Sequence, residues 1–335
     1  MLLNPAIMAL ILVSAVVALM LVMASAFSVQ VLRHWDINSG SERQLELERR
    51  TYLISTLLIW VFASELVSLL LFVYNAESMS GQFVGAMCAT GVLNVNPWGW
   101  PTLFLKIAIF FSGAVWLSIN RLDNQGYDYP LIRLKYWLLL LVLPLVLAEF
   151  VVQLLHFTDM NPNVITSCCG ALFSADAGGV AAEVSGVQPR SAMLGLFGTA
   201  IAVIMAGAWY GRRGSGGGVF ALLSLLAFMM ALIAIVSFVA LYVYEHPHHH
   251  CPFCILKSGH GFAGYWLYVP LFMATALALS SGSLGLGKNI PSLSAAVERD
   301  RPGLTWSAIL LFGTFYLISA WLVINSNLTM EGVWW

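Results

Sequence analysis

Charged residues are scarce in this sequence. Only 9% of the 335 residues are Asp, Glu, Lys or Arg, and 60% are hydrophobic, whereas soluble proteins carry about 25% charged residues. A chain with so little charge cannot cover a surface that faces water. Its net charge of −1 also leaves no basic face for nucleic acid, so that class of partner is excluded. We therefore expect an integral membrane protein that is embedded in the lipid bilayer.

Short motifs of several large enzyme classes are absent as well. The sequence contains no Walker A loop, no H-E-x-x-H, no G-x-S-x-G and no C-x-x-C-H, so ATP-driven transport, standard hydrolysis and covalent haem are not indicated. Non-covalent haem is not expected either, because His156 is the only histidine that lies clearly inside an apolar run.

Long apolar runs, by contrast, are abundant. Eight of them exceed the ~18–20 residues that cross ~30 Å of hydrocarbon. Backbone polar groups in lipid must be satisfied within the segment, which favours helices. The sequence therefore predicts an all-α polytopic membrane protein, a bundle of eight transmembrane helices that forms a single transmembrane domain over 1–335. The expected spans are about 5–32, 51–75, 102–120, 132–157, 191–211, 218–244, 262–282 and 304–325.

The distribution of basic residues predicts the orientation. Twelve of the fifteen Lys and Arg residues fall in segments that follow the first, third, fifth and seventh spans, and such basic segments stay in the cytoplasm. We therefore expect an N-out/C-out protein of the bacterial inner (cytoplasmic) membrane. The opposite loops, 76–101, 158–190 and 245–261, would form a small Cys/His-rich extracytoplasmic cap on the periplasmic side.

All five cysteines fall in these three outer loops. Cys88 lies in the first, Cys168 and Cys169 in the second, and Cys251 and Cys254 in the third. The space outside the inner membrane is oxidising, so these thiols should be disulfide-bonded, metal-bound or catalytic. Adjacent cysteines rarely close a disulfide with each other because the ring is strained. We therefore expect Cys88, Cys168 and Cys169 to supply a disulfide between loops or a second thiol site.

The segment EHPHHHCPFC (245–254) has the densest chemistry in the chain. Imidazole and thiolate ligands together suit zinc or copper. The first interpretation is an extracytoplasmic Cys/His site that binds or hands over a transition metal, with copper favoured. Its expected ligands are His248, His249, His250, Cys251, Cys254 and His260.

Three other interpretations stay open. C-x-x-C is also typical of redox dithiols, in which case Cys251 and Cys254 are catalytic, exchange electrons with a periplasmic protein partner and pass them to a membrane quinone. The chain could instead be a non-catalytic subunit of a larger respiratory or photosynthetic complex. The least specific interpretation is a structural disulfide beside a hydrated histidine turn.

The redox interpretation has a parallel in known families. Outer-face cysteine pairs above a helical bundle resemble the arrangement in membrane thiol oxidases of the disulfide-bond-forming B and vitamin K epoxide reductase types, which bind quinone. Those proteins use a four-helix core, whereas eight helices are expected here. Copper-resistance D-type proteins also have about eight helices, but none of their motifs matches this sequence. No residue role is transferred from either.

Polar residues inside the apolar runs are a second candidate site, because each ionisable one costs at least ~2.5 kcal/mol at the centre of a membrane helix. Glu149, Gln153 and His156 fall on one helical face. Lys106 is expected at a depth similar to Glu149, which predicts an ion pair, whereas Glu65 has no obvious partner. A weak repeat, ASELVSLLLFVYN against LAEFVVQLLHFTD, would place the two glutamates at equivalent depths. The alternative to simple pairing is a polar track for protons, a quinone or a metal ion.

Overall fold

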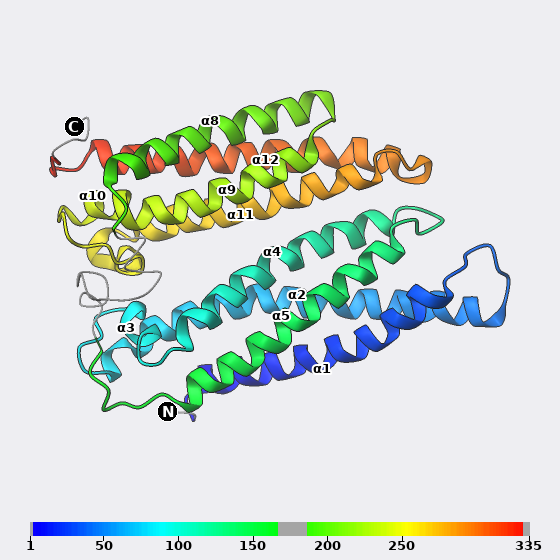
Figure 1. Cartoon of the computed structure of the whole chain (residues 1–335), viewed down its shortest axis with the longest axis horizontal. Coiled ribbons are helices and arrows are strands. Elements are labelled where there is room, and N and C mark those ends of the chain that lie inside the picture. The colour runs from blue at the N-terminus through cyan, green and yellow to red at the C-terminus, as the bar shows by residue number, and fades with distance from the viewer. Residues whose placement is uncertain (1–2, 167–185, 331–335) are drawn as a thin grey trace. The chain divides into compact units, whose positions relative to one another are not determined.

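The computed structural model describes residues 3–166 and 186–330, so the expectations for Cys168 and Cys169 lie outside the described residues. Within that part every regular element is a helix, and eight helices are long and apolar enough to cross a membrane (Figure 1). This confirms a multi-pass all-α membrane protein, while its orientation stays a prediction. The eight spans are Pro5–His34, Glu42–Gln82, Gly99–Asp123, Ile132–Thr158, Pro189–Arg213, Gly217–Tyr244, Ala263–Gly287 and Pro291–Ile324.

Contacts divide the chain into two compact units. Unit 1 comprises Met1–Ser78, Leu93–Pro162 and Leu286–Glu298, and unit 2 comprises Met79–Val92, Asn163–Gly285 and Arg299–Trp335. The expectation of one transmembrane domain is not tested by this partition, and each unit is described by itself.

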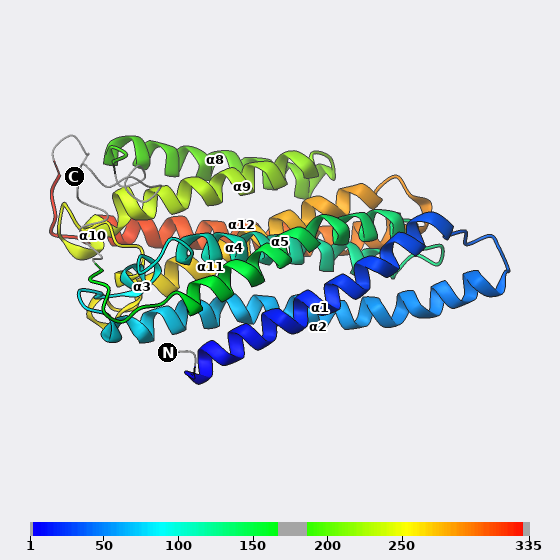
Figure 2. The same cartoon turned by 60° about the horizontal axis from the view of Figure 1, so that its bottom comes forward.

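Unit 1 is built on four long helices, α1 (Pro5–His34), α2 (Glu42–Met79), α4 (Gly99–Asp123) and α5 (Ile132–Thr158). α5 packs against both α1 and α4, as the two views in Figure 1 and Figure 2 show. The Asn4 side chain accepts a hydrogen bond from the Ala6 N–H at 2.9 Å, and Pro5 follows it, so α1 begins with a favourable cap and first turn.

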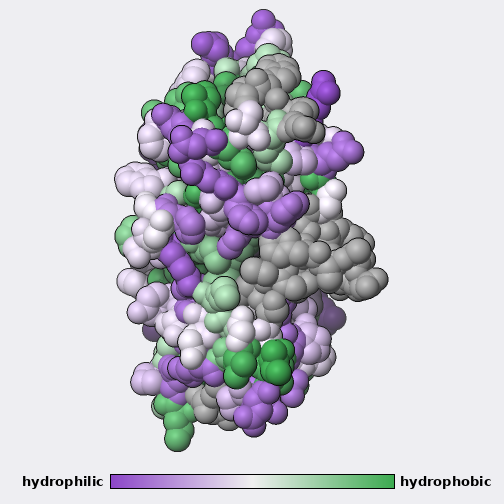
Figure 3. All heavy atoms as spheres, turned by 90° about the vertical axis from the view of Figure 1, so that its left-hand side faces the viewer, coloured by the Kyte–Doolittle hydropathy of each residue, from purple (hydrophilic) through white to green (hydrophobic). Residues whose placement is uncertain are grey.

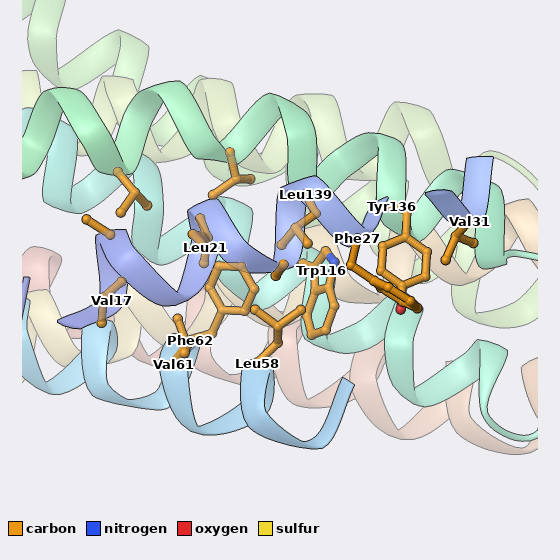
Figure 4. Packing of buried hydrophobic residues seen from close by; sticks show 14 of the residues in the cluster. Val17, Leu21, Phe27, Val31, Leu58, Val61, Phe62, Trp116, Tyr136 and Leu139 are labelled. Atoms are coloured by element: carbon orange, nitrogen blue, oxygen red, sulfur yellow. The ribbon is translucent and has the colours of Figure 1, made fainter. Parts of the chain in front are cut away.

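The core of unit 1 is a continuous stack of aliphatic and aromatic side chains (Figure 4). The rings of Phe62 and Trp116 lie 5.0 Å apart between α2 and α4. A Cβ atom at Gly113 would lie 2.8 Å from Phe62 Cδ1, so only glycine allows α4 to approach this ring so closely. Small residues serve this purpose in membrane bundles, where lipid tails are as apolar as the protein and association depends on close packing.

A buried ion pair joins the end of α4 to the start of α5. Lys135 Nζ lies 2.9 Å from Asp123 Oδ2, and both side chains are fully buried. The second carboxylate oxygen, Asp123 Oδ1, accepts the backbone N–H of Leu131 at 2.8 Å. The indole N–H of Trp116 donates to the Lys135 carbonyl oxygen at 3.1 Å. The connection between the two helices is therefore held by bonds on both sides of one carboxylate.

Unit 2 contains α8 (Pro189–Arg213), α9 (Gly217–Ala234), α11 (Ala263–Leu284) and the larger part of α12 (Pro291–Ile324). α9 packs against both α8 and α11. α8 has proline at its first turn and ends at Gly214, whose φ of 64° is left-handed, the asymmetry typical of helix ends. A Cβ at Gly282 would lie 2.7 Å from the Gly217 carbonyl oxygen, so glycine here allows α11 to approach α9.

The span that begins with α9 is not regular along its whole length. A π turn, η2 (Ile235–Val239), separates α9 from α10 (Ala240–Tyr244). Such turns are rare and often occur at functional sites. The span then leads directly into the EHPHHHCPFC segment (245–254). Two short 3-10 turns follow, η3 (Cys254–Leu256), which begins at its last residue, and η4 (Ser258–His260).

One segment of unit 2 lies, in sequence, between two helices of unit 1. Residues Met79–Val92 belong to unit 2, although they connect α2 to α4 along the chain. They include η1 (Ser80–Gln82) and most of α3 (Ala89–Leu93). As a result Cys88 belongs to the same unit as Cys251 and Cys254.

The buried pair in unit 1 makes a testable stability prediction. Lys135→Met leaves the Asp123 carboxylate buried without a counter-charge, which costs about 3–5 kcal/mol. We expect a clearly lower Tm for the variant in detergent, measured by circular dichroism. The double variant Asp123→Asn/Lys135→Met removes both charges and should recover most of the loss. A double variant as unstable as Lys135→Met alone would show that the charge pairing is not what matters.

Candidate metal centre

Three cysteine sulfurs gather in unit 2. Cys88, Cys251 and Cys254 have their sulfur atoms within 4.8 Å of one another, a group that could hold a metal ion. Their exposed fractions are 0%, 2% and 8%. Cys88 Sγ and Cys251 Sγ lie 3.2 Å apart, well beyond the ~2.05 Å of a disulfide. The two segments that meet here are separated by more than 160 residues of sequence, so this cluster is a product of the fold.

The Cys88 loop is positioned by Thr166, a residue of the same unit. The backbone N–H of Thr166 donates to the Val84 carbonyl oxygen at 2.9 Å, and the Thr166 hydroxyl donates to the Gly91 carbonyl oxygen at 2.8 Å. Thr166 thus bonds to the loop on both sides of Cys88. Buried backbone acceptors in a loop need such partners, and here they fix the loop around the sulfur.

Two tyrosines hold the CPFC backbone. The Tyr244 hydroxyl, at the end of α10, donates to the Cys251 carbonyl oxygen at 2.5 Å. The Tyr268 hydroxyl, from α11, donates to the Pro252 carbonyl oxygen at 2.8 Å. A 3-10 turn then begins at Cys254. The loop is therefore anchored to the two helices on either side of it.

A third contact joins the two cysteine loops directly. The Lys257 ammonium donates to the carbonyl oxygen of Met87, the residue before Cys88. This bond brings a positive charge to the backbone beside the sulfur cluster. Met87 itself is largely exposed, so its side chain faces away from the buried sulfurs.

The two thiols of the CPFC pair differ in pKa. Hydrogen bonds from Cys254 and then Cys88 lower the pKa of Cys251, whereas hydrogen bonds with Cys251 and then Cys88 raise the pKa of Cys254. The Thr90 hydroxyl lies 3.2 Å from Cys251 Sγ and can donate to it. Of this pair, Cys251 is therefore the sulfur that becomes a thiolate first, because hydrogen bonds from its neighbours favour the charged form.

The predicted histidine ligands lie apart from the sulfurs. The metal-ligand group found among the described residues contains no histidine. The rings of His249 and His260 pack against the Tyr244 ring, with centroids 4.1 and 4.6 Å from it. His248 is exposed beside His246, with ring centroids 6.1 Å apart. The prediction that these histidines bind metal together with Cys251 and Cys254 stays untested.

His250 has a different partner, the π turn. Its Nδ1 lies 3.0 Å from the Val236 carbonyl oxygen, and because a carbonyl only accepts, Nδ1 is the protonated ring nitrogen. Burial lowers the pKa of His250, so the ring is neutral at pH 7. The histidine directly before Cys251 therefore tethers the loop to the irregular part of the preceding span.

The second candidate site lies in unit 1, where the expected Lys106–Glu149 ion pair is present. Lys106 Nζ is 2.7 Å from Glu149 Oε1, with both side chains fully buried. Gln153 donates to the Ser14 hydroxyl at 2.8 Å. His156 Nδ1 lies 2.8 Å from Asn96 Oδ1.

The remaining intramembrane carboxyl is Glu65. It is 2% exposed, and within the described residues its two oxygens accept no hydrogen bond. Glu149, Gln153 and His156 on α5 each have at least one polar partner on another segment, although one further polar atom of each has none among the described residues. At Glu65 both oxygens lack a hydrogen bond to any described residue.

Several residues that position the sulfurs were not found from the sequence. Thr90 is only two residues from Cys88, but its hydroxyl contacts the sulfur of Cys251, so no local spacing indicates the contact. Tyr244 and Tyr268 are placed by the fold, and no sequence signal distinguishes them from other tyrosines near helix ends. The meeting of Cys88 with the CPFC pair also required the fold, since the expected partners of Cys88 were Cys168 and Cys169, outside the described residues.

Hydrophilic side chains predominate among the coloured atoms at the end of the helices where these loops lie, with smaller hydrophobic patches between them (Figure 3). Such a mixture is expected at a water boundary.

Comparisons with protein-family models, curated proteins and solved structures give no match.

The tyrosine anchor gives a prediction. Tyr244→Phe keeps the ring between His249 and His260 but removes the hydroxyl bonded to the Cys251 carbonyl. Losing one such bond costs about 1 kcal/mol, which should raise the rate of Cys251 alkylation about fivefold. Peptide-resolved mass spectrometry after timed maleimide treatment measures this rate. Tyr265→Phe, at an exposed tyrosine of α11, is the control and should leave it unchanged. Equal rates in the wild type and Tyr244→Phe would contradict the anchoring role.

Proposed function

We propose that unit 2 binds a soft transition-metal ion, with Cu(I) favoured, through the sulfurs of Cys88, Cys251 and Cys254. The observation that supports this is the convergence of three buried sulfurs from two distant segments. Thiolates are the ligands that select Cu(I) and zinc among the metals of the cell. The proposed role is to bind the ion outside the cytoplasmic membrane and hand it to a periplasmic protein partner.

The distances suit one ion. Three sulfurs at about 2.3 Å from a central metal lie about 4 Å from one another. The cluster lies within 4.8 Å, so such an ion requires little rearrangement. The 3.2 Å contact between Cys88 and Cys251 would have to open by less than about 1 Å.

The number of ligands favours copper over zinc. Structural zinc sites are almost always four-coordinate, whereas three sulfurs alone satisfy a closed-shell Cu(I) ion. Among the described residues no fourth Cys, His, Asp or Glu joins the group. Burial also protects Cu(I) from water and from oxidation. Cys254, at 8% exposed the most accessible of the three, is the sulfur from which an ion would pass to a partner.

Metal content tests the proposal. Full-length protein purified without chelator, reduced and loaded with Cu(I), should retain about one tightly bound ion per chain. Cys88→Ser, Cys251→Ser and Cys254→Ser should each reduce this toward zero, because each removes one of three ligands. The measurement is copper per chain after competition with a chromogenic Cu(I) chelator.

A histidine variant separates the ligand sets. The combined variant His248→Ala/His249→Ala/His260→Ala keeps all three sulfurs and should retain copper at the wild-type level. Loss of copper here would show that imidazoles complete the site. Retention of copper in all three serine variants would contradict the three-sulfur proposal. Zinc bound in preference to copper would reassign the metal.

A second candidate function is thiol–disulfide exchange, favoured by the contact between Cys88 and Cys251. A partner dithiol would attack a Cys251–Cys254 disulfide and leave as a disulfide, so that two electrons and two protons remain on the CPFC pair as thiols. The pair would pass these to a second disulfide that includes Cys88, and a membrane quinone would finally accept them. A redox titration distinguishes the two: an inert CPFC pair, with a potential below about −300 mV, contradicts exchange.

Both functions need the sulfur loops outside the cytoplasm, which we propose from the positive-inside rule. Ser258 and Ser41 are exposed residues in segments predicted to lie on opposite sides. In intact cells a membrane-impermeant maleimide should label Ser258→Cys and not Ser41→Cys, and both after cell lysis. The reverse labelling pattern would invert the topology and place the cluster in the cytoplasm.

A further inference from the structure

An unsatisfied carboxyl lies inside unit 1, apart from the sulfur cluster. Glu65 is on α2, in the interior of a span, and is 2% exposed. Neither of its oxygens makes a hydrogen bond within the described residues. A carboxylate buried in this way costs several kcal/mol unless it is paired or neutralised. The metal proposal makes no use of this residue.

Charged groups from two other helices act on Glu65. They are Lys106 of α4 and Glu149 of α5, which are themselves joined at 2.7 Å and fully buried. From α2, Ser68 accepts a hydrogen bond from the Lys106 ammonium at 2.7 Å. From α1, Ser14 lies 3.5 Å from Glu149 Oε1. All four long helices of unit 1 therefore contribute to one polar site.

The charges at this site do not balance if every group is ionised. One ammonium faces two carboxyls, so the fully ionised site would carry a net negative charge inside the hydrocarbon region. Lys106 is bonded to Glu149 and to Ser68, while the carboxyl of Glu65 has no such partner. A single proton on Glu65 makes the whole site neutral.

We propose that Glu65, Lys106 and Glu149 form an exchangeable proton-binding site within the membrane, in which Lys106 and Glu149 pair and Glu65 holds the proton. Release breaks the Glu65 O–H bond, transfers the proton to water and leaves two carboxylates competing for one ammonium. Lys106 can then pair with either carboxylate, so the deprotonated site has two alternative ion pairs, Lys106–Glu149 and Lys106–Glu65. Ionisable residues inside membrane spans pair with one another and mark proton relays in pumps and transporters.

Polar side chains offer a route from this site toward the end of α5. Gln153 lies one turn beyond Glu149 and bonds to Ser14 and to the Leu10 carbonyl oxygen. His156 follows and bonds to Asn96, which precedes α4. Gln153 and His156 thus extend a line of polar side chains from the buried carboxyls to the loop before α4. Protons would enter or leave the site along this line.

Infrared spectroscopy of the purified full-length protein tests the proposal. A buried protonated carboxyl has a carbonyl-stretch band that is separate from those of carboxylates and shifts in D2O. We expect this band in the wild type and its loss in Glu65→Gln. Lys106→Met removes the ammonium, so both carboxyls should be protonated and the band should grow about twofold. Glu42→Gln, at an exposed carboxyl near the start of α2, is the matched control and should change nothing.

Two further variants keep the test decisive. In Glu149→Gln the only remaining counter-ion for Lys106 is Glu65, which should ionise, so the band should disappear although Glu65 is intact. Glu65→Asp should keep a shifted band and shows that the position tolerates change. A band that persists in Glu65→Gln, or one that is suppressed by millimolar Na⁺, would overturn the proposal, the latter in favour of a sodium site.

Discussion

The absence of hydrogen-bonding partners in hydrocarbon is the constraint on which the rest of this structure depends. In lipid a polar side chain must be satisfied by the protein itself. Lys106 and Lys135 are both fully buried, and each lies within 3 Å of a carboxylate oxygen. The same constraint makes Glu65 conspicuous, because its burial without a partner requires a neutralising proton or ion. Both the stability of unit 1 and its candidate chemistry follow from this one requirement.

The sulfur cluster meets the same constraint in a different way. Its three side chains are buried, yet thiols need fewer partners than carboxylates, since a sulfur packs as a small hydrophobe when protonated. The hydroxyls of Tyr244 and Tyr268 donate instead to the backbone carbonyl oxygens of the loop. This leaves the sulfurs directed toward one another, with Thr90 as a hydroxyl neighbour, which is the arrangement a soft metal requires and an apolar core does not.

The sequence predicted the helices well because each one depends on a local property, the length of an apolar run. It also predicted the Lys106–Glu149 pair, because depth in the bilayer can be counted along each helix. The composition of the sulfur cluster could not be predicted in this way. Histidines next to Cys251 in sequence point to Tyr244 or to Val236, since successive loop residues face different directions. Cys88 reaches the cluster only because Met79–Val92 belongs to unit 2.

Both proposed sites would exchange protons, so a connection between them needs a test that separates it from an ordinary effect of pH. Binding of a metal by thiols releases their protons, so the proposed metal affinity in unit 2 would fall in acid without any contribution from Glu65. A shared dependence on pH is therefore expected even if the two units are independent. Thermodynamic coupling is reciprocal, so a real connection requires two matching effects. Neutralising Glu65 would change copper affinity at constant pH, and loading copper would change the protonation of Glu65 by the same free energy.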